Sequence, residues 1–260
     1  MRTPKEIVES VNEIAHSKAT ISKSRVAVLG FLGGVYIAMG GLLSMIVGPY
    51  FGEVIGASPA LVRIIGSFVF PLGLIMIVMA GAELFTGNCA YFAPNLLSGR
   101  QKKRTVMHNW SVVWVMNFAG AVFFGYFLTY LTQISASEVV HEAFFKVAES
   151  KTSASFGVAF MRGVGANWLV CLAIWLSLST RSMLGKMAGI WFPIMAFVAI
   201  GFEHSIANMF LLPVAMMEGY DLSIVDLMVK NIIPVTLGNM VGGFLFVGGK
   251  YWYLYDRAKL

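Results

Sequence analysis

The sequence is poor in charged residues and in cysteine, and both shortages restrict its class. Charged residues make up 12% of the 260 residues, whereas soluble domains carry about 25%. The two cysteines, Cys89 and Cys171, stand in apolar stretches and give neither a disulfide framework nor a metal-binding spacing. We therefore expect no metal and no cofactor.

Long apolar stretches separate the few charged residues. Hydrophobic residues make up 58% of the chain, and a membrane-spanning helix needs about 20 mostly apolar residues. Six stretches reach that length, at residues 26–48, 60–97, 108–132, 155–178, 187–213 and 231–254. We expect an all-α integral membrane protein with a six-helix transmembrane domain over residues 26–254. A cytoplasmic amphipathic segment over residues 1–25 precedes it, and a short cytoplasmic tail over residues 255–260 follows.

The lysines and arginines indicate how the spans are oriented. With both termini in the cytoplasm, most basic residues fall on the inner side, as the positive-inside rule requires. The outer connections then hold only Arg63, Lys146, Lys151 and Lys230. The net charge of +6 is therefore a topology signal and does not indicate nucleic acid binding. The predicted location is the cytoplasmic membrane.

The two halves of the chain repeat one another. Three short patterns occur in the same order in each half, beginning at Phe31 and Phe160, at Gly81 and Gly201, and at Asn109 and Asn231. Each half has three spans, and an odd number of spans inverts the second half in the membrane. As one helix, residues 60–97 would be about 57 Å long, which exceeds the bilayer. We therefore expect helices 2 and 5 to be broken, near 81–88 and 201–208, around a transport site near the midplane.

Ionisable residues inside the spans are the first candidates for function. His204 can exchange a proton near neutral pH, and its counterpart in the first half is the apolar Leu84. The alternative is a neutral histidine bonded within a packed loop. Glu83 and Glu203 occupy equivalent positions, where they either cap a half-helix or, for Glu203, orient the imidazole. Arg162 lies inside the fourth span and is expected to extend to the outer interface.

Several uncharged residues complete the candidate pore. Thr86 offers a hydroxyl in the first break, where local turn bonding is the alternative. Asn88 and Asn208 are expected to cap the half-helices, and Lys151 is either an interfacial anchor or part of an anion funnel. Asn167 and Asn239 are polar groups on the fourth and sixth spans, with interhelical bonding as the alternative. Apolar residues near the breaks are candidates for a constriction that excludes water, namely Phe70, Leu74, Leu84, Phe85 and Phe197.

Three motifs resemble those of the formate–nitrite transporter family. They are the stretches Gly81–Asn88, Gly201–Phe210 and Asn231–Asn239, and the resemblance covers residues 25 to 254. It implies an aquaporin-like fold, a homopentamer with one pore per protomer, and passage of small monovalent anions such as formate, nitrite or hydrosulfide. It also implies a gating hydroxyl at Thr86, a central histidine at His204 and a vestibule lysine at Lys151. Asn167 and Asn239 would face the pore, and Leu74, Leu84 and Phe197 would form constrictions close to Phe70 and Phe85.

These features predict proton-linked, channel-type passage of a small anion, with formate preferred. A proton transferred from or through His204 would neutralise the weak acid before it enters the apolar constriction. Three rivals stay open: a pore for neutral solutes such as water or glycerol, a membrane-embedded enzyme using His204 and Glu203 as acid and base, and an accessory subunit without flux. The partners expected are the anion, membrane lipid and identical subunits. No catalytic residues are expected.

Overall fold

The computed structural model describes residues 1–257, and the elements within that range are all helices. Six helical segments are long and apolar enough to cross a membrane, at Lys23–Ile55, Pro59–Ala80, Lys103–Tyr130, Phe156–Leu178, Met183–Ile200 and Ile224–Tyr255. The prediction of an all-α chain with six spans is confirmed. Of the expected tail, residues 258–260 lie outside the described residues.

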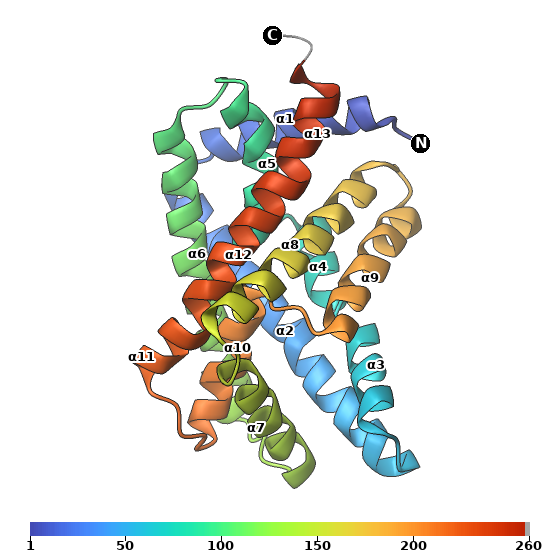
Figure 1. Ribbon diagram of the computed structural model, residues 1–260, viewed down its shortest axis with the longest axis vertical. Helices are drawn as coiled ribbons and strands as arrows, with labels where there is room; N and C mark the ends of the chain where they lie inside the picture. The colour runs from blue at the N-terminus through green and yellow to red at the C-terminus, as the bar shows by residue number, and fades with distance from the viewer. Residues whose placement is uncertain (258–260) are drawn as a thin grey trace.

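The elements follow the same order in both halves (Figure 1). The first half consists of α1 (Pro4–Thr20), α2 (Lys23–Ile55), α3 (Pro59–Val69), α4 (Leu72–Ala80), α5 (Phe85–Leu97), α6 (Lys103–Gly125) and η1 (Tyr126–Tyr130). The second half consists of α7 (Glu138–Thr152), α8 (Phe156–Leu178), α9 (Met183–Ile200), α10 (Ser205–Met217), and a last span built from α11 (Ile224–Asp226), η2 (Leu227–Ile232), α12 (Ile233–Gly243), η3 (Phe244–Gly249) and α13 (Lys250–Tyr255). The N-terminus and the end of α13 lie at one end of the molecule, together with α5, whereas α10 points to the opposite end.

Two helix breaks, where the chain is continuous but not helical, separate α4 from α5 and α9 from α10. Gly81 and Gly201 end α4 and α9 with φ of +83° and +87°, a conformation that favours glycine. The chain then extends, and the next half-helix begins after Leu84 in one repeat and after His204 in the other. The two breaks have the same backbone geometry, so the repeat is structural as well as sequential.

Hydrogen bonds correct the register that we expected for the first span of each repeat. Asn117 Nδ2 donates to Gly30 O at 2.6 Å, and Asn239 Nδ2 donates to Gly163 O at 2.8 Å. Gly30 is therefore the counterpart of Gly163, and the expected match of Phe31 with Phe160 is wrong by four residues. The Phe-x-x-Gly pattern is short enough to recur by chance, whereas the carbonyls that the asparagines reach define the true equivalence.

The corrected register brings α1 into the repeat. Counterparts in the first spans are 133 residues apart (163 − 30), and the same offset superimposes Lys18 of α1 on Lys151 of α7. Helix α1 buries Ile7, Val8, Val11 and Ala15 and packs mainly against α5. The amphipathic segment thus has a counterpart in α7 and is packed into the fold.

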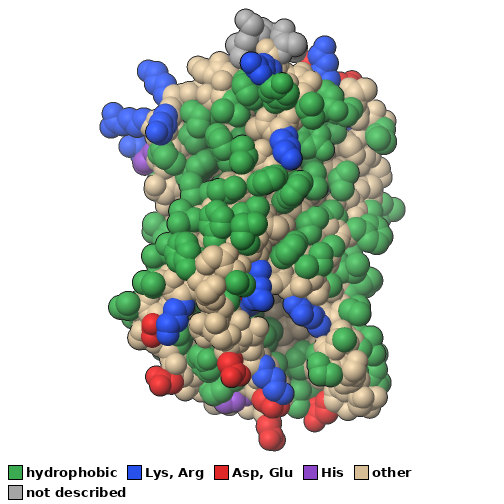
Figure 2. Space-filling model, viewed as in Figure 1, with side chains coloured by type: hydrophobic (Ala, Val, Ile, Leu, Met, Phe, Trp, Pro, Cys, Tyr) green, Lys and Arg blue, Asp and Glu red, His purple; other side chains and the backbone are tan. Residues whose placement is uncertain are grey.

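The surface agrees with a membrane-embedded molecule. Figure 2 shows a broad band of hydrophobic side chains between two ends where charged side chains gather. At the α7 end, lysines and arginines surround a hollow in this face. The interior of the band is close-packed by the pairs α2–α6 and α8–α12, which are counterparts in the two repeats.

Candidate functional site

Two matched polar clusters lie beside the breaks. Lys18 Nζ approaches Glu83 Oε1 at 2.6 Å, and Lys151 Nζ approaches Glu203 Oε2 at 2.8 Å. The carboxylates also accept from Asn88 Nδ2 and Asn208 Nδ2, each at 2.6 Å. Both glutamates are buried, so these bonds offset the desolvation of their charges.

Each cluster extends to the last span of its own repeat. Asn88 Nδ2 also donates to Asn109 Oδ1, and Asn208 Nδ2 donates to Asn231 Oδ1. Asn88 and Asn208 therefore bond side chains and not the half-helix N–H groups that we expected them to cap. The glutamates likewise bind side-chain donors in place of the expected loop N–H groups.

A second pair of asparagines stabilises the extended backbone of the two breaks. Asn117 Oδ1 accepts the Phe85 N–H at 2.9 Å, and Asn239 Oδ1 accepts the Ser205 N–H at 2.8 Å. Their Nδ2 groups donate to the Glu83 and Glu203 carbonyls. Asn239 thus hydrogen-bonds the backbone N–H and C=O groups of the second break. The first backbone N–H of each half-helix is capped by an asparagine of a neighbouring span.

His204 and Thr86 join the two breaks. His204 Nε2 lies 2.9 Å from Thr86 Oγ1, and His204 Nδ1 accepts the Ala207 N–H at 3.2 Å. A nitrogen that accepts a backbone N–H carries no proton, so the neutral ring holds its proton on Nε2 and donates it to Thr86. Nε2 is the ring atom through which His204 can exchange a proton.

Thr86 is also bound from the fourth span. Asn167 Nδ2 donates to Thr86 O at 3.0 Å and to Asn239 O at 2.6 Å. Asn167 occupies the position equivalent to Gly34, and Thr86 the position equivalent to Ile206. The polar residues that break the symmetry of the repeat, including His204, therefore converge on one point.

A cavity leads from the α7 end of the molecule to His204. It has a volume of about 580 Å³, and we call it the Lys151 cavity. Phe70, Phe197 and His204 lie along it with Lys151 and Glu203. The Phe70 and Phe197 rings meet edge to face at 5.7 Å, and Phe197 lies 5.9 Å from the His204 ring.

The remaining apolar candidates lie beyond that cavity. Leu74, Leu84 and Phe85 are buried and do not line it. Leu84 precedes α5 as His204 precedes α10, and the Phe85 ring packs against Trp110 at 6.3 Å. The structure therefore separates the apolar candidates into a Phe70–Phe197 group at the cavity and a Leu84 group at the other break.

Lys18 is the polar residue that sequence reasoning missed. We placed it in a leader helix, whereas it makes the first repeat's version of the Lys151–Glu203 pair. The signal was present, since Lys18 precedes Gly30 by twelve residues and Lys151 precedes Gly163 by the same interval. Arg162, which we expected to extend to the outer interface, lines the Lys151 cavity.

Six apolar spans, two inverted repeats and a buried polar junction between two broken helices define a multi-pass membrane protein of the transport type. The model of the formate/nitrite transporter family matches residues 5–253. The chain belongs to the formate/nitrite transporter family.

Individual relatives agree with that assignment. A probable formate transporter of Methanothermobacter thermautotrophicus is 42% identical over 98% of this chain and 97% of its own length. A solved FNT family ion channel matches with a TM-score of 0.85 at 27% identity, over 96% of this chain and 98% of that chain. A solved pentameric formate channel with formate bound matches with a TM-score of 0.78 at 30% identity, over 90% and 98%. The resemblance inferred from the three sequence motifs is confirmed.

Proposed function

We propose that this protein is a channel for small monovalent anions, with formate as its main substrate. The observation that carries the proposal is the His204–Thr86 contact at the inner end of the Lys151 cavity. It offers a hydrogen-bond donor beside the apolar Phe70–Phe197 group, where an anion would otherwise lose its hydration without compensation. The relatives named for formate support the choice of substrate.

The path begins at the Lys151 cavity. The cationic groups there raise the local concentration of anions. The narrowing at Phe70 and Phe197 excludes water and so favours the neutral acid over the anion. Formate then receives a proton on a carboxylate oxygen, and the product crosses the apolar region as formic acid.

The hydrogen bonds of His204 restrict how that proton arrives. Its Nδ1 is committed to the Ala207 N–H, so a second proton on the ring would break the cap of α10. We propose that the proton comes from hydronium in the water of the cavity and passes directly to a carboxylate oxygen of formate. The ring keeps its Nε2 proton throughout, because that proton is donated as a hydrogen bond to Thr86 and directs the Thr86 hydroxyl toward the solute. Asn167 holds Thr86 by its carbonyl and keeps the hydroxyl at the junction.

The assembly and orientation follow the family. We propose a homopentamer with one pore in each protomer, in the cytoplasmic membrane, with both termini in the cytoplasm and the Lys151 cavity open to the outside. Residues 26–254 form the channel domain between the cytoplasmic segment 1–25 and the tail 255–260. Transport changes no covalent bond other than that to the transferred proton, so we propose no enzymatic activity.

A panel of solutes tests the proposal. Purified protein in liposomes is given formate, nitrite, hydrosulfide, acetate or lactate at two pH values, and the initial rates are compared with protein-free liposomes. Formate is expected to enter fastest. Higher rates for nitrite or hydrosulfide would assign another anion of the same class. Rates for glycerol or water above those for every anion would instead assign a neutral-solute pore.

A further inference from the structure

We propose that Arg63 and Arg162 form a carboxylate-capture site at the mouth of the Lys151 cavity, ahead of the Lys151–Glu203 pair. The inference deepens the proposed function, because it assigns the residues that concentrate the anion before it meets His204. It differs from the sequence-based expectation, which gave that task to Lys151. Three observations carry it: the charge balance of the cavity, the placement of the two side chains, and the uncharged residues at their symmetry-related positions.

The charge balance singles out the two arginines. Four cationic residues line the Lys151 cavity, namely Arg63, Lys146, Lys151 and Arg162. Lys151 is paired with Glu203 at 2.8 Å, and Lys146 with Glu142 at 2.8 Å. Among residues 1–257, no carboxylate lies within ion-pair distance of Arg63 or Arg162. The uncompensated positive charge of the cavity therefore belongs to the arginines.

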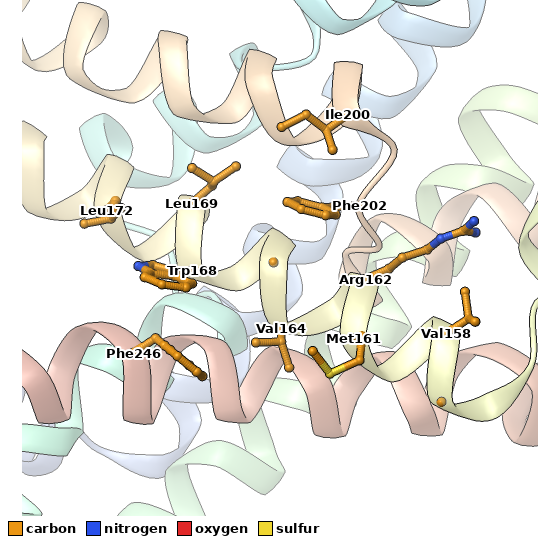
Figure 3. A pocket seen from close by; sticks show the side chains of 12 residues that line it. Val158, Met161, Arg162, Val164, Trp168, Leu169, Leu172, Ile200, Phe202 and Phe246 are labelled. Carbon is orange, nitrogen blue, oxygen red and sulfur yellow. The ribbon is translucent and has the colours of Figure 1, made fainter.

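Arg162 stands between two hollows and is tied by its backbone to the second break. It lines both the Lys151 cavity and an adjoining apolar groove of about 1050 Å³, whose other walls include Trp168, Phe202 and Phe246. In Figure 3 the Arg162 side chain extends away from Trp168 and Phe246, with its guanidinium at the far end. The Arg162 carbonyl accepts the Glu203 N–H, which fixes this turn of α8 to the second break.

Arg63 reaches the same break from α3. Its Nη2 atom lies so close to Gly201 that an added Cβ there would stand 1.8 Å from it. Gly201 is also the residue whose positive φ ends α9. The Arg63 guanidinium thus lies at the loop that leads to Glu203 and His204, and the backbone of Arg162 is bonded to the same loop. Both residues border the same cavity.

The symmetry-related positions of the two repeats carry no such pair. The Glu83 N–H donates to Leu29 O as the Glu203 N–H donates to Arg162 O, so Leu29 is the counterpart of Arg162. Counted back from Gly81 and Gly201 by eighteen residues, the counterpart of Arg63 is Met183. The lysine–glutamate pairs are duplicated, but the arginines are present at one mouth alone. The arginine pair is therefore expected to act on anions that enter from that side.

The chemistry of arginine indicates the ligand class. A planar guanidinium presents two N–H donors in the geometry of a carboxylate, so it binds carboxylates in a bidentate manner. Formate and acetate fit that arrangement, and hydrosulfide gains only the charge attraction. Capture remains weak because Arg63 is exposed to solvent, which suits a site that must release its ligand inward.

The test compares concentration dependence on the two sides of the membrane. Arg63→Gln, Arg162→Gln and the double variant are measured in right-side-out and inside-out vesicles of zwitterionic lipid at low salt. We expect the apparent KM for formate entering at the arginine side to rise roughly threefold in each single variant and roughly tenfold in the double variant. The KM from the other side and the maximal rate should stay within about twofold. High salt should remove the difference, since the interaction is screened.

Two controls make the outcome decisive. Arg181→Gln removes an exposed charge from the α8–α9 connection at the opposite end and should leave the KM unchanged. Arg162→Lys keeps the charge but loses the bidentate geometry, so it should restore hydrosulfide entry more fully than formate entry. An unchanged KM in a folded double variant overturns the capture site while wild-type formate flux stands. Absence of wild-type flux instead overturns the proposed function.

Discussion

His204 is more restricted than an isolated histidine in a pore would be. Its Nδ1 caps α10 and its Nε2 bonds Thr86, so both ring nitrogens have assigned partners. The alternative that we left open, a neutral histidine bonded in a packed loop, describes half of this arrangement. The other half is the position of the ring at the end of the Lys151 cavity, which brings the His204–Thr86 pair next to the path of a solute.

The variant His204→Asn distinguishes the role of His204 as the N-cap of α10 from its role as a hydrogen-bond donor to Thr86. Asparagine is a good N-cap, so the Ala207 N–H keeps an acceptor, but the Nε2–H donor is lost. We expect a folded protein whose formate rate in liposomes falls roughly tenfold, as loss of one hydrogen bond to a charged group predicts. In His204→Leu, which places at this position the residue type of its counterpart Leu84, the formate rate should fall at least as far. A wild-type rate in both variants, with unchanged pH dependence, would remove His204 from the mechanism.

The Lys18–Glu83 pair makes a prediction about stability. Lys18→Met leaves the Glu83 carboxylate, whose side chain is 3% exposed, without its cation. Removing one partner of a buried pair costs about 3–5 kcal/mol, so thermal unfolding in detergent should move to clearly lower temperature. Lys18→Met combined with Glu83→Gln should recover part of the loss.

Lys146→Met is the matched control for that variant. Its pair with Glu142 is 70% and 63% exposed, and such pairs contribute less than about 1 kcal/mol. The unfolding temperature should therefore barely change. Equal effects of Lys18→Met and Lys146→Met would mean that α1 is not part of the packed repeat.

At the scale of the elements, sequence predicted the breaks better than the register. Gly81 and Gly201 stand out because positive φ favours glycine, and the Glu and Asn that follow repeat at a fixed distance. The register of the first spans depends on backbone carbonyls at Gly30 and Gly163. Every residue has a backbone carbonyl, so a sequence motif does not reveal which carbonyl an asparagine side chain will bond.

Close helix contact is the second property of these elements. A Cβ at Gly34 would lie 2.0 Å from the Asn117 carbonyl oxygen, which is backbone of α6 and has little freedom to move. Gly34→Ala should therefore separate α2 from α6 and cost about 3 kcal/mol or more. Gly157→Ala, where a Cβ meets nothing within 4 Å, should leave the unfolding temperature unchanged or slightly raised. Comparable losses in both variants would contradict the packing.

At the scale of the whole molecule, the site exists because two repeats differ. Composition and charge predicted a six-span membrane protein, and the family motifs indicated the candidate residues of the two breaks. The meeting of Thr86 with His204 and the partners of Lys151 depend on how the halves face each other, which pattern spacing does not contain. The duplicated clusters bond the two breaks, and the unduplicated residues are those to which we assign the proposed transport chemistry.

The central claim is that formate crosses this protein at the His204–Thr86 junction together with a proton. The most direct measurement follows the internal pH of liposomes containing the purified protein after formate is added outside, beside protein-free liposomes and liposomes containing His204→Leu. The account predicts rapid internal acidification with the wild-type protein and a rate at least roughly tenfold lower with His204→Leu. Acidification by the wild-type protein no faster than in protein-free liposomes would contradict it.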